Sequence, residues 1–208
     1  KEYSGIAKSG FDVISSQFSL HYYFKDEETI RGFCENLRDL CSSGGYFIGT
    51  CYDGYKLFET FNSLDSDIIE MKDDFGSLIY QIKKLYTIDD FTYNKDFRED
   101  MLGQKIEVFM TSIGQPIVEY LVNFEYFIDI MKEYGFELAI PSFRKGEYNP
   151  IKEPLQSFDK LISLMSEIRE NDNQFINKTK NSDLFKIDKH KGYSLLSGLN
   201  NWFIFQKK

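Results

Sequence analysis

Three groups of polar residues in this sequence have types and spacing that suit ligand binding or catalysis. The first is the segment Gln17–Tyr22, where His21 and Tyr22 follow a short apolar stretch. An imidazole beside aromatic rings is either a packed, hydrogen-bonded side chain or a ligand contact, and both interpretations stay open. The second is Glu119, a carboxylate flanked by apolar residues, which either faces solvent or serves a pocket.

The third group is an acidic run between residues 65 and 74. Its spacing is irregular, and it lacks the glycine-punctuated pattern of a calcium loop. We therefore predict a solvated face that carries these carboxylates: Asp65, Asp67, Glu70, Asp73 and Asp74.

Motifs for hydrolytic, phosphate-binding and metal chemistry do not occur in the sequence, which has no GxSxG, no P-loop and no HExxH. The cysteines Cys34, Cys41 and Cys51 form no CxxC or Cys/His pattern, and there are only two histidines. We predict no metal site, and we expect buried, reduced thiols in a cytosolic type of compartment.

Length and charge restrict the kind of partner. The chain has 208 residues, which suggests one domain or most of one, and its net charge is −8. Free RNA binding usually leaves a basic footprint, so any RNA contact should be a small pocket for a terminal nucleotide. No apolar run approaches the roughly 18 residues of a membrane span, and Lys1–Gly10 has no signal-peptide shape.

The elements around the first polar group read as a βαβ unit. Phe11–Ser16 predicts a buried parallel strand, followed by a loop from Gln17 to Phe24. Asp26 opens a helix to about Leu40, which Gly44-Gly45 closes before a second strand, Tyr46–Thr50. In such sheets, ligands bind at the carboxyl ends of the strands, so the loop after the first strand is the first place to look for a site.

The rest of the chain falls into two parts. Residues 65–115 predict an antiparallel insertion that could form a lid, with strands at Leu78–Ile82, Lys84–Ile88 and Ile106–Met110. Residues 116–208 complete the sheet of the 1–64 βαβ core. The other expected elements are helices over Asp53–Leu64, Phe124–Tyr134 and Phe158–Glu170, strands over Phe136–Ile140 and Asn201–Phe205, and a polar loop over Asn171–His190.

Four segments resemble motifs of the cellular and viral mRNA cap guanine-N7 methyltransferases, in the same order along the chain. Phe11–Tyr22 resembles the central motif of that family, and Gly44–Thr50 resembles the next one. Val118–Val122 resembles a Pro-Glu-aromatic-Leu-Val segment, with valine in place of proline, and Phe203–Lys207 resembles the last strand. The long insertions and polar composition look more like a capping enzyme of a large DNA virus than a cellular enzyme.

The resemblance implies an α/β fold, the C-terminal part of a Rossmann-like class I methyltransferase sheet with an antiparallel lid insertion. It implies transfer of a methyl group from S-adenosylmethionine to guanine N7 of the 5′ mRNA cap. By this resemblance Gln17, Phe18 and Tyr22 lie beside the cofactor. The cap guanine would contact His21, Tyr22 and Glu119.

One position departs from the family pattern. Near the last strand the family usually carries a cap-contacting Tyr, where this sequence has Asn200, with Trp202 close by. We expect Asn200 in the cap pocket, although the residue that replaces the Tyr wall is open. Guanine presents N–H donors at N1 and N2, and a carboxylate such as Glu119 can accept both. Because N7 is an unprotonated lone pair, no catalytic base is required and catalysis should come from alignment.

The resemblance also shows what this sequence lacks. The glycine-rich cofactor loop of the family and its acidic ribose-binding residue do not occur in it. We expect a partial domain whose N-terminal cofactor-binding half is absent, and which alone neither binds the cofactor well nor methylates. The implied partners are that half, the capped mRNA 5′ end, and triphosphatase and guanylyltransferase modules, without a membrane.

The implied location is the host cytoplasm or the virion for a viral enzyme, and the nucleus for a cellular one. Two other functions remain open. One is a non-catalytic stimulatory or RNA-binding subunit with a methyltransferase-like fold, and the other is a small-molecule methyltransferase with a changed substrate.

Overall fold

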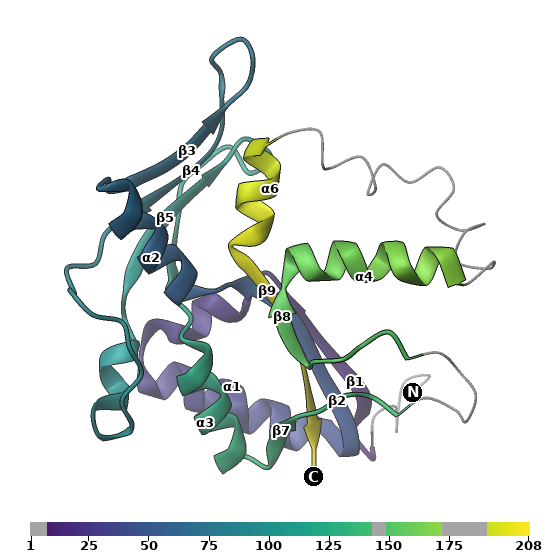
Figure 1. Ribbon diagram of the computed structural model, residues 1–208. Helices are drawn as coiled ribbons and strands as arrows, with labels where there is room; N and C mark the ends of the chain where they lie inside the picture. Colours follow the sequence, from purple (N-terminus) through teal and green to yellow (C-terminus); the bar gives the residue numbers. More distant parts are fainter. Residues whose placement is uncertain (1–7, 143–148, 172–190) are drawn as a thin grey trace, which may run out of the picture.

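A central sheet and a second, smaller sheet organise the molecule in the computed structural model, which describes residues 8–142, 149–171 and 191–208 (Figure 1). The central sheet has the order β1-β2-β9-β7, with β8 also paired to β9. Its strands are β1 (Phe11–Gln17), β2 (Cys41–Tyr52), β7 (Phe136–Leu138), β8 (Leu155–Ser157) and β9 (Asn200–Lys207). Helices separate most of these strands along the chain, and β1 and β2 pair in parallel, which confirms the expected α/β class.

The βαβ unit is present as predicted, but the expectation that its first strand is buried was wrong. Strand β1 lies at the edge of the sheet, and most of its side chains are exposed. Strands β1 and β2 pair in parallel, and η1 (Leu20–Lys25) and α1 (Glu27–Leu40) connect them. The Asp26 side chain caps α1 by accepting from the backbone N–H of Thr29, which satisfies one of the free donors of the first turn. The second strand begins earlier than expected, at Cys41, and the predicted turn at Gly44-Gly45 is an irregular stretch of the strand, where the register jumps between Phe11 and Val13 of β1.

An aromatic cluster holds the helices against one face of the central sheet. Phe47 of β2 and Phe203 of β9 lie 5.3 Å apart by ring centroids, and Phe127 of α3 (Phe124–Glu133) lies 5.4 Å from Phe205. All four rings are at most 1% exposed. Burial therefore accounts for much of the aromatic enrichment of the sequence.

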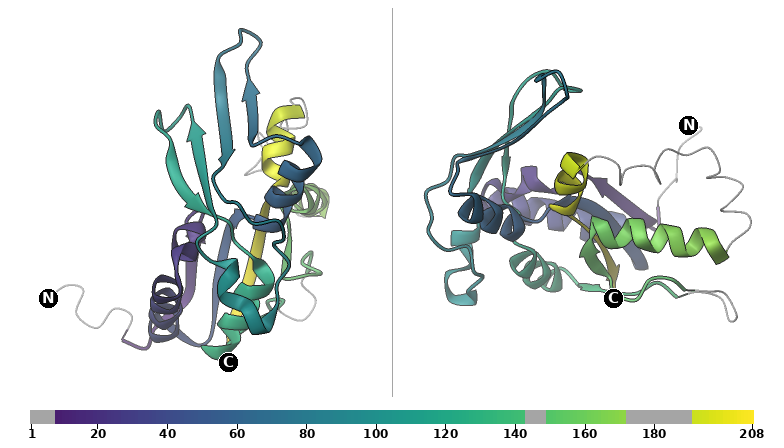
Figure 2. Two further views of the ribbon diagram at one scale, coloured as in Figure 1. Left: turned by 90° about the vertical axis from the view of Figure 1, so that its left-hand side faces the viewer. Right: turned by 45° about the horizontal axis from the view of Figure 1, so that its top comes forward.

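The second sheet is antiparallel throughout, as expected for the insertion. It consists of β3 (Ile68–Lys72), β4 (Leu78–Lys84), β5 (Lys105–Met110) and β6 (Ile117–Tyr120), in that order. The sheet continues past residue 115 because β6 pairs with β5. Figures 1 and 2 show it projecting beyond the end of the central sheet where β2 gives way to α2 (Gly54–Leu64).

Two expectations for the insertion were wrong. The separate strand predicted over Lys84–Ile88 does not form, and Lys84 is the last residue of β4. The chain turns inward after it, and the Tyr86 ring packs against Phe58 with their centroids 5.8 Å apart. Strand β3 was not expected, since it lies within the acidic run and offers only two inward apolar side chains, Ile69 and Met71. The five carboxylates of the run are exposed, as predicted.

The bounds of helices α2, α3 and α4 (Phe158–Asn171) agree with the predicted bounds to within two residues. Helix α6 (Lys191–Gly198), the 3-10 segment η2 (Lys95–Met101) and the short strand β8 were not predicted. After its first residue, the polar loop expected over Asn171–His190 lies outside the described residues. Within the described ranges, no helix combines the length and the apolar character that crossing a membrane requires. The three cysteines are buried and unbridged.

Candidate functional site

A pocket of about 350 Å³ lies where the second sheet meets the carboxyl ends of β1 and β2. Apolar side chains make up most of its wall, with a few polar groups among them, which is the usual character of a small-molecule site. Its lining residues are Phe18, His21, Tyr22, Tyr52, Val108, Met110, Ile113, Glu119, Phe158, Leu196, Ser197 and Asn200.

A sharp change of direction after β1 brings the first polar group into this pocket. Phe18 has a φ of 50°, in the left-handed region, and its backbone N–H donates to the carbonyl of Thr50 at 2.8 Å. A non-glycine residue in this region costs about 1–3 kcal/mol, and such strain is common at functional sites. The turn leads into η1, which buries Leu20 and Phe24 in the core and leaves His21 in the pocket lining.

His21 and Glu119 meet in the lining of the pocket, although they are 98 positions apart in the sequence by their numbers. Their closest atoms, Nε2 and Oε1, are 3.4 Å apart, and the residues are 3% and 6% exposed. Burial lowers the pKa of His21 to about 4 and raises the pKa of Glu119 to about 7. Both shifts disfavour a charged pair, so at neutral pH the imidazole is uncharged and the carboxyl group is close to its midpoint.

Several buried polar atoms of this pocket have no hydrogen-bond partner within the described part of the chain. They are both ring nitrogens of His21, Oε2 of Glu119 and Oδ1 of Asn200. An unsatisfied buried polar group costs about 1–3 kcal/mol, so each one calls for an explanation. A ligand with matching donors and acceptors would satisfy them.

Asn200 opens β9 and is 5% exposed. Its Nδ2 donates to the carbonyl of Leu196 at 2.9 Å, which fixes the orientation of the amide. The oxygen is therefore the unpartnered atom of this side chain. In this orientation Asn200 can accept a hydrogen bond from a ligand but has little left to donate.

Tyr52 is a pocket residue that the sequence reasoning missed. It is the last residue of β2 and pairs directly with Asn200 of β9. The signal was available: Tyr52 ends the strand next to β1, and the carboxyl ends of adjacent parallel strands share one edge of the sheet. The strand that the sequence predicts ends at Thr50, two residues before Tyr52, so the prediction does not place Tyr52 at this edge.

The residues expected beside the cofactor lie at the outer rim of the pocket. Phe18 and Tyr22 line it and are 51% and 42% exposed. Gln17 is exposed next to them, accepts from the Thr50 hydroxyl at 2.8 Å and donates to the Ser15 hydroxyl at 2.9 Å. Two accessible rings and an amide at the carboxyl end of β1 offer stacking and hydrogen-bonding groups at this rim.

Trp202, expected close to Asn200, does not line the pocket. It is 6% exposed, within β9, where it pairs with Thr50 of β2 on one side and Gln156 of β8 on the other. Its indole Nε1 has no hydrogen-bond partner among the described residues.

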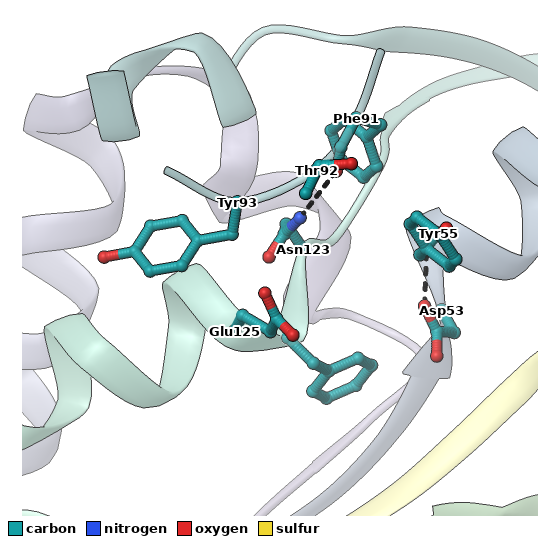
Figure 3. Close-up of a pocket in the computed structure, with 8 residues that line it drawn as sticks. Asp53, Tyr55, Phe91, Thr92, Tyr93, Asn123 and Glu125 are labelled. Carbon is teal, nitrogen blue, oxygen red and sulfur yellow. Dashed lines mark hydrogen bonds between the residues drawn. The ribbon is translucent and has the colours of Figure 1, made fainter. Parts of the chain in front are cut away.

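A second cavity, of about 410 Å³, lies where α2 and α3 begin (Figure 3). Its polar groups already have structural roles. Asn123 caps α3 by accepting from the Tyr126 N–H and donates to the Phe91 carbonyl, each at 3.0 Å. Asp53 accepts from the Tyr55 N–H at 3.0 Å. No buried side chain that lines this cavity, within the described ranges, lacks a partner, so these helix caps hold the fold together.

No group of three or more His, Cys, Asp or Glu side chains that could hold a metal ion occurs among the described residues.

The sequence of this chain is similar to proteins of mRNA capping. Residues 2–189 match the mRNA (guanine-N(7))-methyltransferase domain model. An mRNA cap guanine-N(7) methyltransferase of Candida glabrata is 33% identical over 129 residues, which cover 62% of this chain and 30% of that protein. A probable mRNA-capping enzyme of Acanthamoeba polyphaga mimivirus is 27% identical, over 95% of this chain and 17% of that protein.

The chain thus spans less than a third of the length of either relative. Among solved structures, the CcbJ methyltransferase of Streptomyces caelestis aligns with a TM-score of 0.47 at 11% identity, over 97% of this chain and 59% of that one. On the match of its sequence to the domain model, this chain belongs to the mRNA (guanine-N(7))-methyltransferase family.

Proposed function

We propose that the pocket between the two sheets binds the guanine of the mRNA cap and presents its N7 to the methyl group of S-adenosylmethionine. The buried carboxylate of Glu119 is the observation that carries this proposal, because its Oε2 has no partner in the described part of the chain. Guanine offers two adjacent donors, N1–H and N2–H, which match the two oxygens of one carboxylate. Adenine lacks that pair and would leave the carboxylate unsatisfied.

The bound cofactor supplies an electrophilic methyl group. The protein's part is to hold the base in line with it, and in this proposal Phe18, Tyr22 and Gln17 contact the cofactor's edge. N7 carries no proton to remove, so no residue has to act as a base, and well-oriented alignment can contribute about 7–11 kcal/mol. The methylated base is cationic, and the neutral imidazole of His21 avoids placing a second positive charge beside it.

The charge of the chain supports a small pocket for one nucleotide. With a net charge of −8, the chain has no basic footprint that could follow an RNA backbone. The proposed partner is therefore the capped 5′ end of an mRNA. Reactions that remove the terminal phosphate and transfer the guanylyl group must precede this step, so we propose triphosphatase and guanylyltransferase modules as functional partners.

Discrimination between purines tests the proposal. The chain is expected to bind the cap analogue GpppG. It should bind GTP about 10-fold or more tightly than ITP, which lacks the 2-amino group, since a hydrogen bond to a charged group is worth about 1.5–3 kcal/mol. ATP should bind about 100-fold more weakly than GTP. Isothermal titration calorimetry measures all of these affinities. Equal affinity for GTP and ATP would contradict the proposal.

The affinity for guanine should depend on pH through Glu119. The free pocket has a pKa of about 7 at this carboxyl group, and guanine binding needs the ionised form. Affinity should thus level off near about pH 8 and fall toward tenfold per pH unit below pH 7, where binding releases close to one proton. The ligand should be GpppG, whose bridging phosphates do not titrate in this range. A flat profile between about pH 5 and 8 would exclude Glu119 as the guanine acceptor.

A further inference from the structure

The wall of the pocket that faces β9 contains a residue without an assigned role. Tyr52 lines the pocket beside Asn200, and it is 8% exposed. A large aromatic side chain that ends a strand at a ligand pocket can offer its ring to a ligand, in addition to packing in the core.

The register of the central sheet explains how Tyr52 comes to lie there. Tyr52 and Asn200 are directly opposite each other on the antiparallel strands β2 and β9. Side chains opposite each other on such a pair share one face, with Cβ atoms about 4.5–5.5 Å apart. The Asn200 amide is short and tied to the Leu196 carbonyl, so the larger Tyr52 supplies the bulk of this wall.

Tyr52 also lies close to the guanine-recognising carboxylate. The negative charge of Glu119 adds to burial in raising the pKa of the Tyr52 hydroxyl well above its ordinary value. Glu119 acts in the same direction on the pKa of Tyr22. Both tyrosines line the same pocket as this carboxylate, one from β2 and one from η1.

The backbone around Tyr52 is firmly held. The N–H of the next residue, Asp53, donates to the Leu199 carbonyl at 2.8 Å, and the Asp53 carboxylate accepts from Asn201 Nδ2 at 2.7 Å. Lys56 Nζ then donates to Asn201 Oδ1 at 2.7 Å. This network joins the end of β2 to the start of β9, so the Tyr52 ring is preorganised and does not have to be ordered by the ligand.

We propose that Tyr52 is a further substrate-contacting residue, whose ring forms the wall against which the cap guanosine lies, with Asn200 beside it as a hydrogen-bond acceptor. This inference rests on the proposed function. It assigns the aromatic wall of the pocket to β2, where the sequence alone pointed to the start of β9 and found only an asparagine.

Substitution of the ring tests the inference. Tyr52→Leu should weaken GpppG binding by the chain about 5- to 100-fold, as expected for loss of one base–aromatic contact. Tyr52→Phe keeps the ring and should stay within about threefold of wild type by the same argument. Tyr46→Leu is the matched control, because Tyr46 lies on the same strand, paired with Gln206 at the opposite end of β9, and should bind as wild type.

A second measurement covers the case in which Tyr52→Leu does not fold. In the wild-type chain with GpppG bound, nuclear Overhauser effects are expected between the Tyr52 ring protons and guanine H8 or ribose H1′. Their absence with binding intact would overturn the inference. Wild-type affinity for GpppG in a folded Tyr52→Leu variant would also overturn the inference. If Glu119→Gln loses binding in the same experiment, the proposed function still stands. If the wild-type chain shows no preference for guanine over adenine, the proposed function fails first and the inference with it.

Discussion

Glu119→Gln should reduce GpppG binding at about pH 8 by roughly 100-fold or more, while the folded chain becomes no less stable. The loss of binding follows because glutamine has one acceptor oxygen where guanine presents two adjacent donors, and its NH2 group, which can only donate, faces the second donor of the base. A mismatched, partly unpaired buried polar contact of this kind costs more than a simple missing bond.

Glu119→Gln should weaken binding but raise the free energy of unfolding. The folded pKa of Glu119, about 7, lies above the ordinary value of 4.5. Between these values the folded state holds a proton that the unfolded state has released, so the contribution of this group to stability falls as the pH rises and is lowest above pH 7. Glutamine never ionises, so at about pH 8 the variant should gain on the order of 1 kcal/mol in the free energy of unfolding.

Calorimetric titration and urea denaturation measure the two effects on the same sample. Glu107→Gln is the matched control, since Glu107 lies on β5 of the same sheet, opposite Val118, on the face turned away from Glu119. It should change neither quantity. Wild-type binding by Glu119→Gln would remove the residue from the guanine site, and a large loss of stability would show that its carboxylate has a structural partner.

The elements that carry a strong local pattern could be predicted from the sequence. Helix α1 has an acidic first turn, a capping Asp26 and a regular apolar stripe, and it folds within one residue of its expected start. Strand β3 has neither pattern, since acidic residues surround its two inward side chains. Its pairing with β4 determines its structure, and tertiary context of that kind does not show in a local window.

The candidate site was predictable only in part. His21 and Tyr22 follow a strand of a βαβ unit, which placed them at the carboxyl edge of the sheet. The approach of Glu119 depends on β6, which carries it to a position opposite Ile106 on the inner face of the second sheet. The sequence left Glu119 open between solvent and pocket, because strand register across a sheet of four strands is a long-range property.

The close contact between β1, β2 and β9 gives the second large effect, on stability. Gly49 lies in β2 between Ser16 of β1 and Phe203 of β9. A Cβ added there would lie 2.4 Å from the Ser16 carbonyl oxygen and 2.4 Å from Phe203 Cζ, far inside van der Waals contact. Neither neighbour can move freely, since one is strand backbone and the other belongs to the buried aromatic cluster with Phe47 and Phe205.

Gly49→Ala should therefore lower the free energy of unfolding by about 3 kcal/mol or more, the upper range for an overpacked core. Gly32→Ala in α1 is the contrasting control, because an added Cβ there meets nothing within 4 Å. Removing a helical glycine should stabilise the chain by about 0.5–1 kcal/mol. Urea denaturation compares both with wild type, and an unchanged midpoint for Gly49→Ala would contradict the packing. The added Cβ of Gly49→Ala pushes against Ser16 of β1, the strand that leads into the loop carrying His21. Any folded Gly49→Ala protein should therefore also bind GpppG more weakly. Gly32→Ala should bind GpppG as wild type does.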